Sequence, residues 1–416
     1  MTLVGAHGLQ GRGAYQPVIE RQGTRWIAYI GHHAGRATNP LTGRVEENGT
    51  SILEVTDPRE PRLLAHIPGD GGAQMARVCI GLPKAPRDRA YLLRTLGHHA
   101  HEVWDVTDPA RPAFVTTVSK GLSDTHKSWW ECDTGIAYLV SGAPGWRTTR
   151  MTQVFDLSEP SRPRFIRDFG LPGQEPGAQG PVPTGLHGPI STGPKGNRIY
   201  FGYGTNAGGV MQVVDRRKLL EGPREPTVAN LLHPQVSRLD LPPTMGAHTT
   251  FPVLGMHVPE FRHDAGGARR DYVVIVNEAL TRHCREARQM VWLADVSIET
   301  HPMTVSGWTV RESSGDYCAK GRFGAHASNE SFAPIFYGKL VFVAFFNAGV
   351  RAVDIRDPLR PVEVARFVPA GDPVTNNVEV DERGYIYAVD RAGMGLHVLR
   401  LSGAAARIVE AGPKTP

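Results

Sequence analysis

The phrase LEVTDPREPRLLAHI, from Leu53 to Ile67, returns along the chain with its pattern intact. The further copies are WDVTDPARPAFVTTV from Trp104, FDLSEPSRPRFIRDF from Phe155 and VDIRDPLRPVEVARF from Val353. Each copy has an apolar run with an acidic residue, then Asp-Pro or Glu-Pro, a second proline and another alternating run. Proline presets φ for a turn, and the acidic residue before it accepts backbone N–H bonds. Each copy therefore predicts two antiparallel strands joined by a turn.

The copies follow a regular period. Asp57, Asp108 and Glu159 are each 51 residues apart, which is the length of one four-stranded blade of a β-propeller. Degenerate copies surround Asp215 and Asp295, and a partial copy near the end of the chain, residues 384–401, makes seven in all. These phrases resemble the LVIVD repeat, named for its apolar and acidic strand. The resemblance covers most of the chain and implies a seven-bladed β-propeller, but it implies little about activity.

We therefore expect an all-β protein in which the 416 residues form a single domain. Its seven blades are expected to be four-stranded antiparallel sheets, with an inner strand A followed by B, C and an outer D. The expected blades span residues 13–70, 71–121, 122–172, 183–243, 244–312, 323–371 and 372–410.

Composition and charge argue against several classes of protein. The net charge is +5 and the basic residues are scattered, which argues against a nucleic-acid partner. No apolar run approaches the ~18 residues that span a membrane, and no export signal is visible at the start, so we expect a cytoplasmic protein. The four cysteines lie far apart without a CxxC motif, which argues against a zinc ribbon or a thioredoxin-type site. We expect them to be reduced and buried, with a disulfide between Cys284 and Cys318 as the alternative. The oligomeric state is not predicted.

Four histidines occur in one recurring setting. They lie in SDTHKSWWE at His126, TGLHGPIS at His187, MGAHTTFP at His248 and RFGAHASNES at His326. Each follows turn-like residues and precedes an extended run, so each is expected at the start of strand A in blades three to six. Strand A begins beside the propeller axis, and the four imidazoles are therefore expected to converge there.

Convergent neutral imidazoles suit Fe(II), Cu, Zn or Ni better than Mg or Ca. The alternative is a set of structural histidines, but blades one, two and seven carry amides near the matching position, at Gln16, Gln74, Asn376 and Asn377. The repeat itself therefore does not require histidine. The arrangement is similar to the axial four-histidine Fe(II) centre of carotenoid and stilbene cleavage oxygenases, although the ligand spacing differs. That resemblance implies oxygenase chemistry by analogy only.

Other polar residues are candidates for supporting roles. Carboxylates commonly hold the outer N–H of metal-binding imidazoles, and the candidates are Glu131, Glu278, Glu330 and Glu379. Glu330 is favoured because it lies four residues past His326, on the same side of an extended strand. The B–C loops should open on the same face and carry possible acid–base or substrate-binding residues: His32, His33, His98, His99, His101, Arg147, Arg150, Arg391, Asn347 and Tyr203. The repeated GHH of the first two blades also fits a second metal site or an exposed loop.

The sequence predicts a mononuclear metalloenzyme, and we favour an Fe(II) oxygenase that uses dioxygen on a small aromatic or conjugated anion. The alternatives are a Zn- or Mn-dependent hydrolase or lyase, a Cu-dependent thiol oxidase, and a propeller scaffold without catalysis. HEVWD at His101 is not HExxH, and no GxSxG, P-loop or GxGxxG motif occurs. Serine hydrolase, kinase and Rossmann dehydrogenase classes are thereby excluded.

Overall fold

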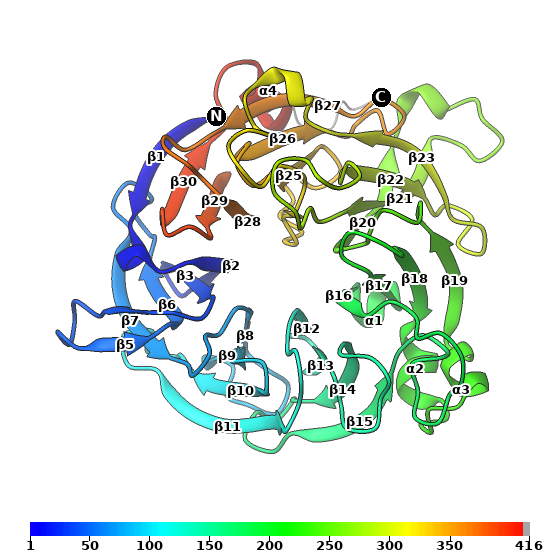
Figure 1. Ribbon diagram of the computed structural model, residues 1–416, viewed down its shortest axis with the longest axis horizontal. Coiled ribbons are helices and arrows are strands. Elements are labelled where there is room, and N and C mark those ends of the chain that lie inside the picture. Colours follow the sequence, from blue (N-terminus) through cyan, green and yellow to red (C-terminus); the bar gives the residue numbers. More distant parts are fainter. Residues whose placement is uncertain (411–416) are drawn as a thin grey trace.

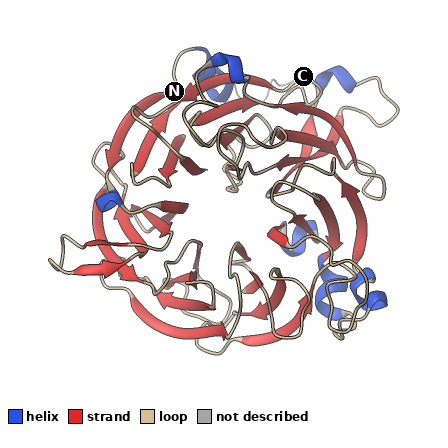
Figure 2. Cartoon of the chain, in the orientation of Figure 1, coloured by secondary structure: helices blue, strands red, loops and turns tan. Residues whose placement is uncertain are grey.

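The computed structural model describes residues 1–410, which form seven four-stranded antiparallel sheets arranged in a ring (Figure 1). The prediction of an all-β seven-bladed propeller is confirmed. Strands make up the ring, and helices are short segments between them (Figure 2). The first three blades are β2 (Ala14–Gln22), β3 (Arg25–His32), β6 (Gly49–Glu54) and β7 (Arg62–Pro68); β8 (Ala76–Ile80), β9 (Ala90–Leu96), β10 (Ala100–Asp105) and β11 (Ala113–Lys120); and β12 (Ser128–Trp130), β13 (Ile136–Ser141), β14 (Met151–Asp156) and β15 (Arg164–Phe169).

The next three blades follow the same order from axis to rim. They are β16 (Leu186–Ser191), β17 (Arg198–Tyr203), β18 (Val210–Asp215) and β19 (Gln235–Asp240); β20 (Thr249–His257), β21 (Arg269–Val276), β22 (Val291–Asp295) and β23 (Met303–Trp308); and β24 (Ala327–Ser328), β25 (Leu340–Ala344), β26 (Val350–Asp354) and β27 (Val362–Phe367). The remaining elements are a ribbon, β4 (Arg36–Thr38) with β5 (Val45–Glu47), the helices α1 (Gly193–Gly196), α2 (Arg216–Glu221), α3 (Val228–Leu232) and α4 (Ala404–Glu410), and the 3-10 turns η1 (Leu9–Gly11), η2 (Pro259–Phe261) and η3 (Glu312–Ser314).

The seventh blade is closed by the first strand of the chain. It comprises β28 (Thr375–Val380), β29 (Tyr385–Asp390), β30 (Leu396–Arg400) and β1 (Thr2–His7), which pairs with β30 so that Thr2 faces Arg400. Figure 1 shows β1 beside β30 at the rim. The predicted first blade begins at residue 13, so the sequence pattern did not reveal this strand. Its pairing covers the edge that a three-stranded last blade would leave open.

The repeated Asp-Pro phrases form the turns between the third and fourth strands of their blades. Asp57 Oδ1 accepts a 3.0 Å bond from the backbone N–H of Arg59, and Asp108 Oδ1 accepts one of 3.1 Å from Ala110. The carboxylate therefore caps the turn as its position before proline predicts. The apolar faces of the two strands it joins then pack against neighbouring blades. One such cluster joins Val154 and Phe169 of blade three to Phe201 and other residues of blade four.

The cysteines differ from their prediction. Cys79 is bonded to Cys132 and Cys284 to Cys318, with Cα–Cα distances of 5.1 and 5.3 Å, which are normal for disulfides. The prediction of reduced thiols is wrong. The alternative, a disulfide between Cys284 and Cys318, is found, and the folded ring also brings together Cys79 and Cys132, which are 53 residues apart in sequence.

No helix within residues 1–410 has the length and apolar character needed to cross a membrane.

Candidate metal centre

The four histidines lie at the inner ends of four consecutive blades. The backbone N–H groups of His126, His248 and His326 donate to Val140, Val276 and Ala344, one in each neighbouring strand B, over 2.9, 2.9 and 3.0 Å. His187 lies within β16 itself. The chain can enter β20 only through a small residue, because a Cβ on Gly246 would lie 2.0 Å from the carbonyl oxygen of Thr205. The backbone hydrogen bonds between strands A and B therefore fix the main chain from which each imidazole projects.

The four imidazoles gather at the propeller axis. His126 Nε2 lies 3.2 Å from His187 Nε2. The ring centroids of His187 and His248 are 3.8 Å apart, and those of His248 and His326 are 4.5 Å apart. All four side chains are at most 5% exposed. Two nitrogens bound to one tetrahedral ion at about 2.0–2.1 Å would be roughly 3.3 Å apart, so the separation of His126 Nε2 and His187 Nε2 fits a shared ion as well as a hydrogen bond between the two rings.

The tautomer of His326 points a lone pair into this cluster. Its Nδ1 hydrogen-bonds to the backbone carbonyl oxygen of Asn376, which can only accept. Nδ1 therefore carries the proton, and Nε2 of the neutral ring is unprotonated. That Nε2 is buried without a hydrogen-bond donor among the described residues. A buried, unsatisfied lone pair at the propeller axis is the arrangement that a cation would satisfy.

The surroundings keep the four imidazoles neutral. Burial lowers the pKa of His187 to about 4 and of His326 to about 3. Burial also moves the pKa of His126 and of His248 well below the ordinary value, with Arg150 adding to the effect at His126 and His187 at His248. Neutral rings are the form in which histidine binds metal ions.

Glu278 and Tyr15 complete the cluster. Glu278 Oε2 lies 3.5 Å from His187 Nε2, and Oε1 lies 3.5 Å from His326 Nε2. The Tyr15 hydroxyl lies 3.1 Å from His126 Nε2. Burial disfavours a charged Glu278, but the pKa of this carboxyl is held below its ordinary value, with the bonded guanidinium of Arg322 among the causes. Burial and Glu278 raise the pKa of Tyr15. The residues His187, His248 and Glu278 place potential ligand atoms within 4.8 Å of one another, and His126 and His326 lie outside this set.

A cavity of about 860 Å³ opens onto the cluster. Tyr15, His126, His187 and Glu278 contribute to its lining, together with five arginines: Arg12, Arg36, Arg150, Arg322 and Arg391. Most of these arginines already have partners, such as the bidentate pair of Arg150 with Asp124 at 2.7 and 3.0 Å. The Arg391 side chain is exposed and has no hydrogen-bond or ion-pair partner within residues 1–410. It remains available for a ligand.

The predicted loop residues divide into two groups. Those that line the cavity are His33, His98, Arg150 and Arg391. The others lie outside its lining, and four of them have hydrogen-bond partners elsewhere. His32 bonds to Ser51 at 2.8 Å and Tyr203 to Gln212 at 3.0 Å, while Asn347 donates to the Tyr317 carbonyl at 2.7 Å and Arg147 to the Gly173 and Gly180 carbonyls. His101 is buried and His99 is exposed. The structure therefore does not place this second group in the cavity as the sequence predicted.

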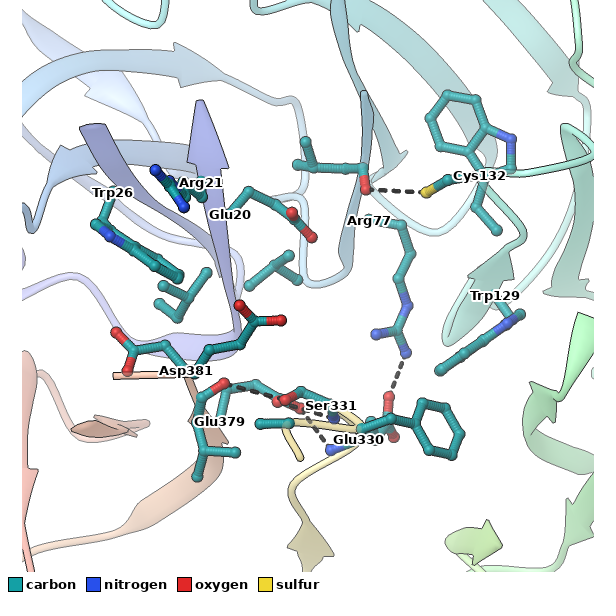
Figure 3. A pocket seen from close by; sticks show the side chains of 18 residues that line it. Glu20, Arg21, Trp26, Arg77, Trp129, Cys132, Glu330, Ser331, Glu379 and Asp381 are labelled. Carbon is teal, nitrogen blue, oxygen red and sulfur yellow. Dashed lines mark hydrogen bonds and ion pairs between the residues drawn. The ribbon is translucent and has the colours of Figure 1, made fainter. Parts of the chain in front are cut away.

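Three of the four predicted supporting carboxylates are elsewhere. Glu131 accepts bonds from Arg216, Ser191, Tyr138 and Thr134. Glu330 pairs with Lys127 and Arg77, and Glu379 accepts from the backbone N–H groups of Glu330 and Ser331. Figure 3 shows Glu330, Arg77 and Glu379 in a second cavity, of about 430 Å³. Glu330 misses its predicted place because β24 ends at Ser328, so strand alternation does not extend to residue 330.

Glu278 is near the histidines, but in another role than predicted. Its oxygens face the inward Nε2 atoms of His187 and His326 rather than outer N–H groups. Two outer Nδ1 atoms instead meet the Asn376 carbonyl, at His326, and Thr249 Oγ1, at 2.8 Å from His248. Those of His126 and His187 are buried without a hydrogen-bond partner among the described residues. Tyr15 and Arg322 were missed by sequence reasoning. Tyr15 could have been found by its place at the start of the first inner strand, beside Gln16.

Comparison with known proteins supports the fold alone. The crystal structure of Chaetomium thermophilum Raptor is similar with a TM-score of 0.59 at 11% sequence identity. The similarity covers 97% of this chain and 29% of that one. No family model and no curated protein matches the sequence.

Proposed function

We propose that the protein is a mononuclear metalloenzyme whose ion is held at the propeller axis by His126, His187, His248 and His326. The observation that carries this proposal is the gathering of four buried, neutral imidazoles at the axis, with a 3.2 Å separation between His126 Nε2 and His187 Nε2. The buried lone pair of His326 Nε2 supports it, because a buried structural histidine would be expected to have both ring nitrogens hydrogen-bonded.

The proposed reaction is Fe(II)-dependent oxygenation of a small aromatic or conjugated anion. Iron in such a site would supply dioxygen binding and electron transfer. The protein would contribute rigid imidazoles from four sheets and the charge of Glu278, which Arg322 orients through a 2.7 Å bond. A ligand set made mainly of neutral rings leaves a net positive centre, and this favours an anionic substrate.

The cavity is the proposed substrate site. Its volume of about 860 Å³ falls in the usual range for small-molecule pockets. Arg391 is proposed to bind the substrate carboxylate or phenolate, since a guanidinium can hold such a group through two bonds. Arg150 is proposed to contribute positive potential rather than direct contact, because Asp124 occupies its guanidinium.

The experiment is element analysis of the full chain, purified without chelator or added metal. We expect about one iron per chain, and a strong loss of iron in each of the four single His→Ala variants. His101→Ala is the matched control, because His101 is also fully buried but lies outside the cluster. Wild-type protein without a stoichiometric metal, or full occupancy in all four variants, would refute the proposal.

A zinc-dependent hydrolase is a second candidate, and the position of Glu278 favours it. A carboxylate beside a zinc site serves as a general base toward water in metalloproteases. Glu278 lies 3.5 Å from two of the proposed ligand nitrogens. The same element analysis separates the two candidates, because zinc rather than iron would then be found.

Two further sequence predictions stay predictions. The LVIVD resemblance stays a prediction, because no family model matches the sequence. A cytoplasmic location remains an expectation, and the two disulfides weigh against it, because disulfides persist mainly in oxidising compartments.

A further inference from the structure

The hydroxyl of Tyr15 lies at the axis beside two of the four imidazoles. It is 3.1 Å from His126 Nε2 and 3.4 Å from His248 Nε2. Tyr15 enters from β2, so blade one presents a phenol oxygen where blades three to six present a nitrogen. The side chain is only 3% exposed.

Neighbouring groups fix the direction of this hydroxyl. The Tyr15 ring packs edge-on against His33, His126 and His326, at centroid distances of 5.1, 5.3 and 5.6 Å. Its backbone carbonyl accepts a bond from the Asn376 side chain at 3.4 Å. A phenol enclosed in this way has little freedom to turn its oxygen away from the axis.

The hydrogen bonds of Tyr15 conflict with metal binding by the histidines. Within residues 1–410 its hydroxyl has two partners, and both are Nε2 atoms of proposed ligands. An imidazole lone pair that binds an ion cannot also accept a hydrogen bond. With the ion in place, the phenol therefore loses both of its histidine partners, and its oxygen would lie beside the ion.

We propose that Tyr15 is a fifth protein ligand, binding the ion through its phenolate oxygen. This inference rests on the proposed function, because it requires the four-histidine site. On ligation the O–H bond breaks, the oxygen keeps the electron pair and bonds to the ion, and the proton leaves to solvent. A cation at bonding distance favours the charged form of its ligand. A site that includes an anionic oxygen binds oxidised iron or copper more tightly than a site made of imidazoles alone.

The test is optical and needs no substrate. Phenolate bound to Fe(III) or Cu(II) gives a ligand-to-metal charge-transfer band in the visible region, whereas imidazole ligands do not produce a phenolate signature. The full chain would be loaded with Fe(III), Cu(II) or Zn(II), and its metal content measured beside its spectrum. We expect a visible band with Fe(III) and Cu(II) and none with Zn(II), whose filled d shell has no redox chemistry.

The deciding variant is Tyr15→Phe. We expect it to lose the band while retaining more metal than any of the four His→Ala variants. Tyr203→Phe is the matched control, since Tyr203 is fully buried and bonds to Gln212, outside the cluster; it should keep the band. Resonance Raman spectra of the wild type, excited in the band, should show phenolate ring vibrations and make the test independent of how Tyr15→Phe folds.

The outcomes separate this inference from the proposed function. A wild-type protein that holds one Fe(III) without a phenolate band, or a band that survives Tyr15→Phe, overturns the ligation and leaves the four-histidine site standing. A wild-type protein that binds none of the three ions overturns both.

Discussion

Arg322 donates a 2.7 Å hydrogen bond to Glu278 Oε1, while the same carboxylate lies 3.5 Å from two histidine nitrogens of the axial cluster. The guanidinium thus holds a negative charge at the edge of a site made of neutral rings. We expect Glu278→Gln to weaken divalent-metal binding by about 10–100-fold, as changes next to metal ligands typically do. Competition against a chromophoric chelator measures this affinity. Glu286→Gln, in the same loop, is the control and should bind as the wild type does; equal affinities in both variants would exclude a role for Glu278.

Arg391 should contribute to anion binding in the cavity. Because its guanidinium is exposed and already solvated, the expected loss in Arg391→Ala is modest, about two- to fivefold in the affinity for benzoate. Calorimetric titration of the metal-loaded protein measures the effect, and it should shrink at high salt. Benzyl alcohol, which carries no charge, should bind the variant and the wild type alike. The substitution Arg360→Ala, in an exposed turn, should change neither ligand. An equal loss for both ligands would argue against charge recognition.

The two disulfides should stabilise the protein to a similar extent, but only one of them should affect metal binding. They close segments of 53 and 34 residues, and each Cys→Ser pair should lower the free energy of unfolding by about 2–5 kcal/mol. Denaturant titrations of the paired variants measure this. Cys284–Cys318 also ties together the two loops that carry Glu278 and Arg322, so only its removal should weaken metal binding. Equal metal affinity in the two paired variants would contradict this coupling.

Glu379 should make stability depend on pH. Burial, together with the charge of Glu330, raises its pKa to about 8 from an ordinary value of 4.5, against the opposing effects of Arg77 and of backbone N–H bonds from Glu330 and Ser331. Lys127 also faces this group. Between these two pH values the folded state holds a proton that the unfolded state has lost. The free energy of unfolding should therefore fall as pH rises from about 4.5 to 8, by at most about 1.4 kcal/mol per pH unit.

The matched variant for this effect is Glu379→Gln, which resembles the protonated acid at every pH. Its stability should be less sensitive to pH across the window, so the two curves should separate as pH rises. The ionisation of Glu330 does not interfere, because its neighbours Lys127 and Arg77 overcome the effect of burial and lower its pKa to about 2. Parallel curves for wild type and variant, from urea titrations at a series of pH values, would show that Glu379 does not titrate in this range.

Local sequence patterns were sufficient to predict the propeller architecture. The Asp-Pro turns and the 51-residue period describe how one blade is built, and both depend on residues near one another in sequence. The four axial histidines could be found for the same reason, since each has the same place in its own repeat. Contacts between repeats could not be found this way. Glu330 was assigned to His326 by strand alternation, yet β24 is two residues long and Glu330 pairs instead with Arg77 and Lys127 of other blades.

The sequence by itself determined that the chain forms a ring of seven sheets and that four histidines occupy equivalent positions in it: His126, His187, His248 and His326. Only the tertiary structure decided that β1 completes the last blade, that Cys79 meets Cys132, and that Tyr15 and Glu278 join the histidines. The physical reason lies in the closure of the ring. Turn chemistry and hydrophobic period act within a blade, whereas the partners of a side chain at the axis come from blades far apart in sequence. Tyr15 and His248, for example, are 233 residues apart.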